Sequence, residues 1–297
     1  MDLHYVLDRP HLNDGARLVR VKPRYNADVN QWWLCDEGRY GLAWIDQGRL
    51  RKVRGPVDVT GAQNATDDPP PAAHTTWDVA LGTISAALSG LPKGRIGVIA
   101  SAQLTSEELF LIREIFQRGL GAQVSASVPE KPGSADDFLI KADKNPNTTG
   151  AQLLGLAGSG APDAGQILDA ALAGNLDALW VMGHDLVELF GEEKASQLRD
   201  KVGLFVFSGP NENQTLPFAH WALPSAAYVE KDGTFVNCDG RVQRIEQAFP
   251  PLEDSREDWR IFLELARLLE LEIEWTEPRD IFTGLASAEA PFAGLSY

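Results

Sequence analysis

The feature that most limits the fold is an alternation of short apolar runs with amphipathic helical stretches after Thr76. A strand–helix–strand pattern at this spacing predicts a parallel sheet with helices packed on both faces. We therefore expect an α/β fold with a Rossmann-like, mostly parallel sheet. The expected strands are 95–100, 122–128, 178–182, 203–207 and 221–223, and the expected helices are 77–88, 105–116, 164–172, 186–198 and 255–271.

The sequence predicts three parts. Residues 1–55 are expected to form a small β-rich module, because 16–22 alternates polar and apolar residues as a half-buried strand does. Residues 56–76 read as a linker, since Gly, Asn, Asp and Pro dominate without an apolar period. Residues 77–297 form the expected α/β domain, which includes a hairpin turning at Asp239-Gly240.

The formal net charge of −15 is unevenly distributed. Up to Arg54 there are ten Lys and Arg against seven Asp and Glu, or +3, whereas the remainder has seventeen against thirty-five, or −18. We expect no nucleic-acid partner, because an acidic body repels polyanions. The basic N-terminal part is either a contact for an acidic partner or anionic ligand, or a solvated surface of mixed charge.

The sequence indicates a cytoplasmic protein. It contains no apolar run of the roughly 18 residues that cross a bilayer, so we expect no direct membrane insertion. Its start has no basic region followed by an apolar stretch, so no secretory signal is expected. The two cysteines lie far apart in the sequence and predict no disulfide framework.

The carboxyl ends of the predicted strands are the expected ligand edge. The glycines that let a backbone approach a pyrophosphate are missing after the strand at 95–100, so NAD and ATP are not expected there. Gly183-His184-Asp185 follows the strand at 178–182. His184 is either a base at this edge or an ordinary edge residue, with Asp185 capping the next helix.

Cys35 lies beside Trp32 and Trp33, and Asp36-Glu37-Gly38-Arg39 follows it. It is either a metal ligand or a structural thiol. A single cysteine cannot hold a zinc ion or an iron–sulfur cluster, which need about four ligands. A metal at Cys35 would therefore need ligands from a partner chain. Cys238 lies beside the predicted hairpin turn and is expected to be structural.

Several blocks of the sequence resemble the molybdopterin oxidoreductase superfamily and, within it, the large iron–sulfur subunit of bacterial NADH-quinone oxidoreductase (complex I). The blocks are Arg24-x-Asn26-x-x-Val29-Asn30-x-x-Trp33-x-Cys35-Asp36-x-Gly38-Arg39-Tyr40, Arg49-Leu50, Asp143-Lys-Asn-Pro-Asn147-Thr-x-Gly150, Ala219-His-Trp-Ala-Leu223-Pro224, Glu230-x-Asp-Gly233-Thr-Phe-x-Asn237-x-x-Gly240-Arg241 and Glu257-Asp258-Trp259. They follow the family's order along nearly the whole chain.

The resemblance implies vestigial cofactor contacts at Cys35, Arg39, Gly183, His184 and Asp185, and no catalytic residue. It also marks departures from the family. Residues 1–24 contain no cysteine, although family members with a cluster have three before this motif. Glu37 stands where cofactor-binding members have a lysine near the pterin. The chain is expected to be a shortened relative, because catalytic subunits are at least twice as long.

These observations give three functional expectations. The first is a non-catalytic, cofactor-free structural subunit that docks on other peripheral-arm subunits of complex I through its basic part, 17–54. The second is a minimal redox enzyme that binds molybdopterin or a [4Fe-4S] cluster with ligands from a partner chain. The third is an independent ligand-binding module that uses the sheet edge. In the first, Cys35 is a relic, and Trp33 is expected to pack in the core of the N-terminal module.

Overall fold

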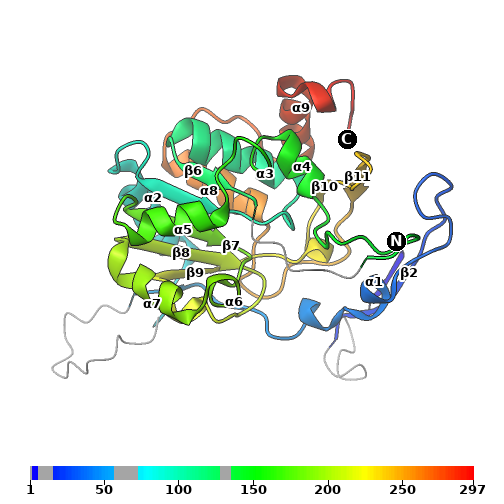
Figure 1. Cartoon of the computed structure of the whole chain (residues 1–297), viewed down its shortest axis with the longest axis horizontal. Helices are drawn as coiled ribbons and strands as arrows, with labels where there is room; N and C mark the ends of the chain where they lie inside the picture. Colours follow the sequence, from blue (N-terminus) through cyan, green and yellow to red (C-terminus); the bar gives the residue numbers. More distant parts are fainter. Residues whose placement is uncertain (1, 6–15, 57–72, 128–134) are drawn as a thin grey trace.

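The computed structural model describes residues 2–5, 16–56, 73–127 and 135–297, and it confirms the expected α/β fold. A mixed sheet of seven strands runs through the molecule in the order β4-β3-β9-β8-β7-β5-β6 (Figure 1). Its strands are β3 (Arg54–Gly55), β4 (Ala73–His74), β5 (Ile96–Ile99), β6 (Gln123–Ser125), β7 (Ala178–Met182), β8 (Leu204–Gly209) and β9 (Trp221–Pro224).

Five neighbouring strands, from β6 to β9, are parallel. Their register aligns Val98 with Trp180, and Trp180 with Val206. The short strands β3 and β4 add antiparallel pairs beyond β9. The edge strand β4 therefore lies at the end of the stretch predicted as a linker, 56–76. The predicted domain boundaries stay a prediction.

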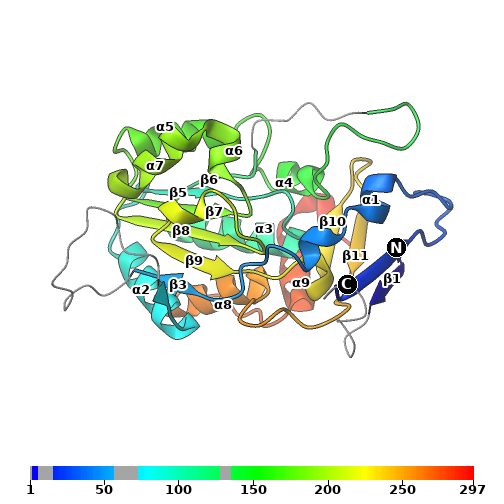
Figure 2. The same cartoon turned by 90° about the horizontal axis from the view of Figure 1, so that it is seen from below.

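Helices cover both faces of this sheet, as Figure 2 shows. One face packs against α2 (Trp77–Ser89), α3 (Ser106–Ile112) and α8 (Asp258–Leu268), and the other against α5 (Ala164–Leu172) and α7 (Glu192–Lys201). Side chains of β7 alternate between the two apolar cores, because successive residues of a strand point to opposite faces. Further elements are α4 (Thr148–Leu153), α6 (Leu186–Phe190), α9 (Pro278–Ala288) and a π-type segment, η3 (Arg113–Gly119).

Local signals set the helix starts. The Thr76 side chain accepts a hydrogen bond from the backbone N–H of Val79 and caps α2, and Thr105 with Glu108 forms a capping box at the start of α3. The single helix expected over 186–198 is wrong. Gly191 has a φ of 91°, a backbone conformation that suits glycine, and it divides this stretch into α6 and α7.

The described residues 2–5 and 16–53 form a smaller part, which we call the head. It contains an antiparallel pair, β1 (Asp2–Tyr5) and β2 (Leu18–Lys22), the one-turn helix α1 (Asp36–Tyr40) and the short turn η2 (Ala43–Ile45). We call the rest of the described chain the body. Leu18, Val21 and Ile45 of the head pack against Ala227, Val229 and Phe249 of the body.

Next to the head, the body forms the expected hairpin from β10 (Gly233–Val236) and β11 (Val242–Ile245), joined around Asp239-Gly240. The turn η5 (Tyr228–Glu230) precedes it, and η4 (Leu216–Phe218) and η6 (Ala290–Phe292) complete the short helical elements. Within the described ranges, no helix combines the length and apolarity that crossing a bilayer requires.

Candidate functional site

A cavity of about 410 Å³ lies between the head and the carboxyl ends of the parallel strands. Glu37, Gly38 and Trp44 line it from the head. Ser101, after β5, and Gly183, after β7, line it from the sheet. Ligands of α/β proteins bind at this end of a parallel sheet, so the cavity is the candidate functional site.

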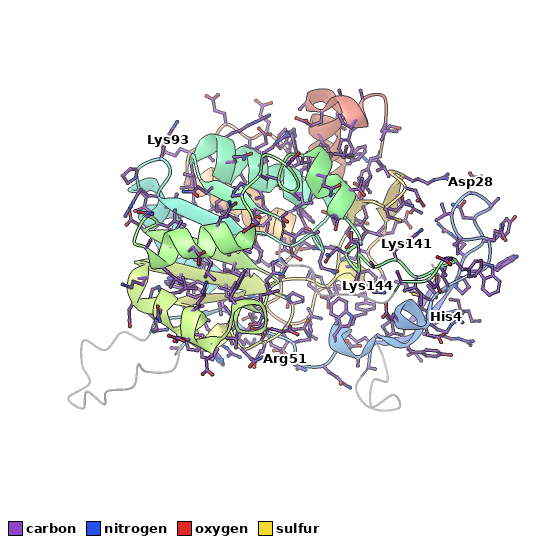
Figure 3. All side chains as sticks on the ribbon, in the orientation of Figure 1. His4, Asp28, Arg51, Lys93, Lys141 and Lys144 are labelled. Atoms are coloured by element: carbon purple, nitrogen blue, oxygen red, sulfur yellow. The ribbon has the colours of Figure 1, made fainter. Side chains whose placement is uncertain are left out.

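The cavity wall is mostly apolar and carries four charged side chains. The apolar residues are Leu42, Trp44, Leu104, Pro146, Met182, Pro210, Tyr228, Phe235 and Ile245. The charged residues are Glu37, Lys144, Lys231 and Asp258. Lys144 and Glu37 form an ion pair of 3.2 Å between the body and the head, and Figure 3 labels Lys144 at this boundary.

Lys231 is buried at the inner wall. Its Nζ donates to Oε1 and Oε2 of Glu108 at 2.9 and 2.8 Å, and to Oδ2 of Asp258 at 3.1 Å. Burial alone would lower the pKa of Lys231, but the two carboxylates outweigh it and raise this pKa above its ordinary value. All three ammonium hydrogens are thus directed at protein carboxylates.

The two acids of this cluster are Asp258 and Glu108. Burial raises the pKa of Asp258 to about 6, while the charge of Lys231 opposes the shift. Glu108 also accepts the backbone N–H of Thr105, which fixes it at the start of α3. The cluster therefore contains one buried cation and two acids, and it has no positive charge to offer a ligand.

Glu107 is a further fully buried acid, one residue before Glu108. Its Oε2 accepts the backbone N–H of Thr234 at 2.8 Å, whereas its Oε1 has no hydrogen-bond partner in the described structure. Burial raises the pKa of Glu107 to about 7. The nearby phenol of Tyr297 has a raised pKa, through burial first and the charge of Glu107 second.

A buried ion-pair network joins the head to the body. Arg49 and Glu230 have fully buried side chains and pair at 3.1 and 2.8 Å in a two-pronged arrangement. Arg17 adds a contact of 2.5 Å to Glu230, and its Nε pairs with Asp46 at 2.7 Å. Planar guanidinium groups suit this two-pronged contact with a carboxylate. Arg49 and Glu230 both belong to the blocks that carry the resemblance, and here they hold the two parts together.

The structure gives Cys35 a structural position. It is the N-cap of α1, and its half-buried Sγ accepts the backbone N–H of Gly38 at 3.4 Å. The other cysteine, Cys238, is exposed beside the hairpin turn. Over the described ranges, no group of three or more His, Cys, Asp or Glu side chains is arranged to hold a metal ion.

The other predicted site residues are not brought together. Gly183 alone of its triplet lines the cavity, where it has a φ of 70°. The Nε2 of His184 meets the carbonyl oxygen of Ala100 at 3.0 Å, and burial lowers the pKa of His184 to about 4. The ring is therefore neutral and donates from Nε2, which leaves this nitrogen unable to act as a base. Asp185 caps α6 by accepting the N–H groups of Val187 and Glu188.

Arg39 lies on another surface. It lines a groove of about 540 Å³ on the head, together with Arg20 and Tyr40, and it is absent from the cavity wall. Glu37 and Gly38, one and two residues earlier, face the cavity instead. The one-turn helix α1 thus directs the two halves of the motif to different surfaces.

Sequence reasoning missed the buried cluster of Lys231, Glu108 and Asp258. A signal was present, because Glu107 and Glu108 interrupt a stretch whose other residues are those of a buried helix. Carboxylates in such a position need a partner, since an unpaired buried charge is costly. No local pattern indicates that Lys231, more than a hundred residues later, is that partner.

Residues 145–268, less than half of the chain, match the family model of the molybdopterin oxidoreductases. This segment of the body is therefore similar to the molybdopterin oxidoreductases, in agreement with the resemblance that the sequence blocks indicate. The finer likeness to the large iron–sulfur subunit of complex I stays a prediction.

Particular proteins show the same similarity. A stretch of 135 residues is 35% identical to the putative formate dehydrogenase YrhE of Bacillus subtilis and covers 44% of this chain and 14% of that protein. A stretch of 134 residues is 33% identical to the alpha subunit of the NADPH-Fe(3+) oxidoreductase of Geobacter sulfurreducens. It covers 45% of this chain and 16% of that protein. The chain thus matches about one sixth or less of these relatives.

One solved structure, the acetylene hydratase of Pelobacter acetylenicus, aligns with 67% of this chain and 24% of its own. The sequence identity is 15% and the TM-score is 0.37.

Among the described residues, both cations that line the cavity, where an anionic pterin cofactor would lie, are already paired with acids. Lys144 is paired with Glu37, and Lys231 is paired with Glu108 and Asp258. A pterin phosphate binds where cations or backbone N–H groups are directed at it, and acids in their place repel it. A [4Fe-4S] cluster needs about four thiolates, and the whole sequence contains two cysteines.

Proposed function

We propose that this chain is a non-catalytic structural component related to the large iron–sulfur subunit of bacterial NADH-quinone oxidoreductase. In this role it binds other subunits of the peripheral arm and contributes no cofactor of its own. Its place would be the cytoplasmic side of the membrane, to which its partners attach it. Both the partners and the location are part of the proposal.

The observation that carries the proposal is the use of the family's motif residues as internal structural contacts. Arg49 pairs with Glu230 inside the protein, and Asn147 connects the backbone of Leu104 to that of Val236. Cys35 caps its own helix. These motif residues are engaged with the protein itself, which supports a scaffold over a catalyst.

A second contact explains why one motif glycine suits this fold. A Cβ on Gly233 would lie 2.5 Å from the side chain of Thr105, the N-cap of α3. The hairpin can approach the start of α3 this closely only with glycine at that position. The block around Glu230 and Gly233 therefore preserves the packing of the hairpin on α3, in agreement with a structural role.

Elemental and cofactor analysis of the purified chain tests the proposal. Iron, acid-labile sulfide, molybdenum and extractable pterin should all be far below one equivalent. Co-expression with the peripheral-arm subunits of a bacterial NADH-quinone oxidoreductase should yield a complex containing this chain. Stoichiometric iron with sulfide, or molybdenum, would contradict the cofactor-free role, and failure to co-purify with any of these subunits would contradict the partner.

The cavity favours one alternative, a redox enzyme whose cofactor ligands come in part from another chain. Its volume of about 410 Å³ lies within the usual range of small-molecule sites, and it opens at the expected edge of the sheet. The Cys35→Ser variant separates the two roles. For a structural thiol, the complex should keep its metal content, and the free energy of unfolding should fall by about 1 kcal/mol or less. Loss of iron from the complex would instead make Cys35 a ligand.

A further inference from the structure

The structure divides the basic residues of the head by whether their charge is already neutralised. Arg17 and Arg49 pair with the buried Glu230. Arg51 pairs with Glu253, and Lys52 pairs with both Glu253 and Asp254. Each of these cations is paired with an acid of the body.

Arg20 and Arg39 differ from these cations. Across the described ranges, neither has an ion-pair partner. Arg20 is exposed on β2, and Arg39 is half-buried in the last turn of α1. Both line the groove of about 540 Å³ on the head. Two unneutralised guanidinium groups therefore border one concave surface.

The same groove also has solvent-exposed apolar side chains in its walls. The side chain of Tyr40 is 73% exposed and that of Val19 is 44% exposed. Of the eleven large apolar side chains that are exposed in the described structure, seven lie between residues 19 and 44. An exposed apolar surface of this density on one small part of a protein marks an interaction site.

We propose that the groove between β2 and α1 binds an acidic segment of a partner protein. Carboxylates of that segment pair with Arg20 and Arg39, and an apolar side chain between them packs on Tyr40 and Val19. The proposal refines the structural role above, because it takes the partner to be a peripheral-arm subunit. Charge complementarity selects this occupant, since two of the three guanidinium groups at the groove, Arg20 and Arg39, have no ion-pair partner among the described residues, and the acid that lines it, Asp46, is paired with Arg17.

A nucleic acid or a lipid surface fits the charges less well. Either would extend beyond the head and meet the body, and the chain after Arg54 carries a net charge of −18 from seventeen basic and thirty-five acidic residues. An extended polyanion is repelled there. A short acidic segment touches the head alone and avoids this repulsion.

The test reverses the two charges in the full chain. Arg20→Glu with Arg39→Glu is compared with Lys93→Glu with Arg267→Glu, which makes the same change in net charge at exposed positions of the body (Figure 3 labels Lys93). Each variant is co-expressed with the peripheral-arm subunits, and the recovered complex is quantified. The groove variant should lose about tenfold or more in affinity, and the control variant should match the wild type.

A second measurement does not depend on complex I. A fluorescent peptide of alternating Glu and Leu should bind the wild-type chain, and more weakly as the salt rises from about 0.05 to about 0.5 M. The same peptide with Gln in place of Glu, inorganic phosphate, and vesicles with about a quarter of anionic lipid should bind at least tenfold more weakly. The double variant Arg20→Gln with Arg39→Gln should also weaken peptide binding. It replaces the charge-reversed variant in this test if charge reversal impairs folding.

The outcomes separate the groove from the broader function. Complex formation that survives the loss of both arginines overturns the groove and leaves the structural role. Arginine-dependent peptide binding without any complex supports the groove and contradicts the peripheral-arm partner. Tighter binding to the vesicles or to phosphate than to the acidic peptide overturns the protein occupant, and so does the absence of peptide binding by the wild type.

Discussion

The body and the head are held in place by different interactions. The body has an apolar core on each face of its sheet, with large aromatic residues such as Phe262 and Trp180 fully buried. The head contributes three buried apolar residues to a small shared cluster and is joined to the body by the Arg49–Glu230 pair. Burial of apolar surface stabilises the body, whereas buried charge fixes the position of the head.

The two parts should therefore tolerate mutation differently. An apolar core tolerates shape changes of similar volume, whereas a buried ion pair tolerates no loss of either partner. A mutation in the body core should lower stability in proportion to the cavity it leaves. A mutation of the joining network should disturb the relation between the two parts, and its effect depends on charge more than on size.

The largest expected effect is in the body core. Phe262→Ala removes a ring that packs edge-on against Phe116 and Trp180, at centroid distances of 6.2 and 6.5 Å. The free energy of unfolding should fall by about 3–5 kcal/mol, measured by urea denaturation. Leu18→Ala in the head should cost only about 2 kcal/mol, because its cluster is smaller. An equal or larger cost at Leu18 would remove the distinction between the two parts.

Glu230→Gln tests the joining network. The substitution keeps the size of the side chain and leaves Arg49 buried without its counter-charge, so the free energy of unfolding should fall by about 3 kcal/mol. Hydrogen exchange should rise first in residues 16–53. Glu253→Gln is the matched control, because it weakens an exposed pair with Arg51 and should change stability by about 0.5 kcal/mol or less. Equal effects of the two variants would mean that the buried pair does not fix the head.

Glu107→Gln should show that the buried acid Glu107 lowers the stability of the body at high pH. The pKa of Glu107 is raised from 4.5 to about 7, so its stabilising contribution is complete below pH 4.5 and is lost as the pH rises through about 7. At about pH 8 the variant should be more stable than the wild type by roughly 1–3 kcal/mol, and this advantage should disappear near pH 4.5.

The neighbouring acid provides the control for that pH effect. Glu108→Gln removes a carboxylate from Lys231 and should destabilise the protein at both pH values. Urea denaturation across this pH range measures both variants. Parallel pH profiles for Glu107→Gln and the wild type would show that Glu107 titrates as it does in the unfolded chain.

The smallest effect is expected at Trp33. Its side chain is 54% exposed and contacts Phe138 edge-on at a centroid distance of 5.1 Å, so the expectation that it packs in the core of the head is wrong. Trp33→Ala should lower the free energy of unfolding by about 1 kcal/mol or less, which is the value of an exposed aromatic contact. A loss above about 2 kcal/mol would indicate that the head buries this ring in solution.

The sequence predicted the parallel sheet because its central strands are buried on both faces and therefore read as continuous apolar runs. All five residues of β7 are buried, and its predicted bounds are those observed. The short strands β3 and β4 have two residues each and form only because distant segments pair with them. No local pattern reports such pairing. The break at Gly191 also escaped prediction, because an apolar period does not register one residue with a positive φ.

The candidate site was predictable at the level of the sheet edge only. The rule that ligands bind beyond the carboxyl ends of parallel strands placed Gly183 correctly at the cavity. The direction of a side chain depends on contacts distant in sequence, so the sequence did not show that the His184 ring contacts Ala100 or that Arg39 lines a groove on the head. Lys231 was missed for the same reason, since its partners Glu108 and Asp258 come from two other elements.

The position of Arg49 and Leu50 bears on how such a protein can be divided by gene fission or by a protein engineer. Leu50 is fully buried in the body core on the α5 face, and its N–H donates to the carbonyl oxygen of Pro210. Arg49, the residue before it, neutralises Glu230. A body expressed from a point after residue 50 would lack both an apolar core residue and the counter-charge of a buried acid. A stable body therefore needs the last residues of the head, and the chain should be divided upstream of Arg49.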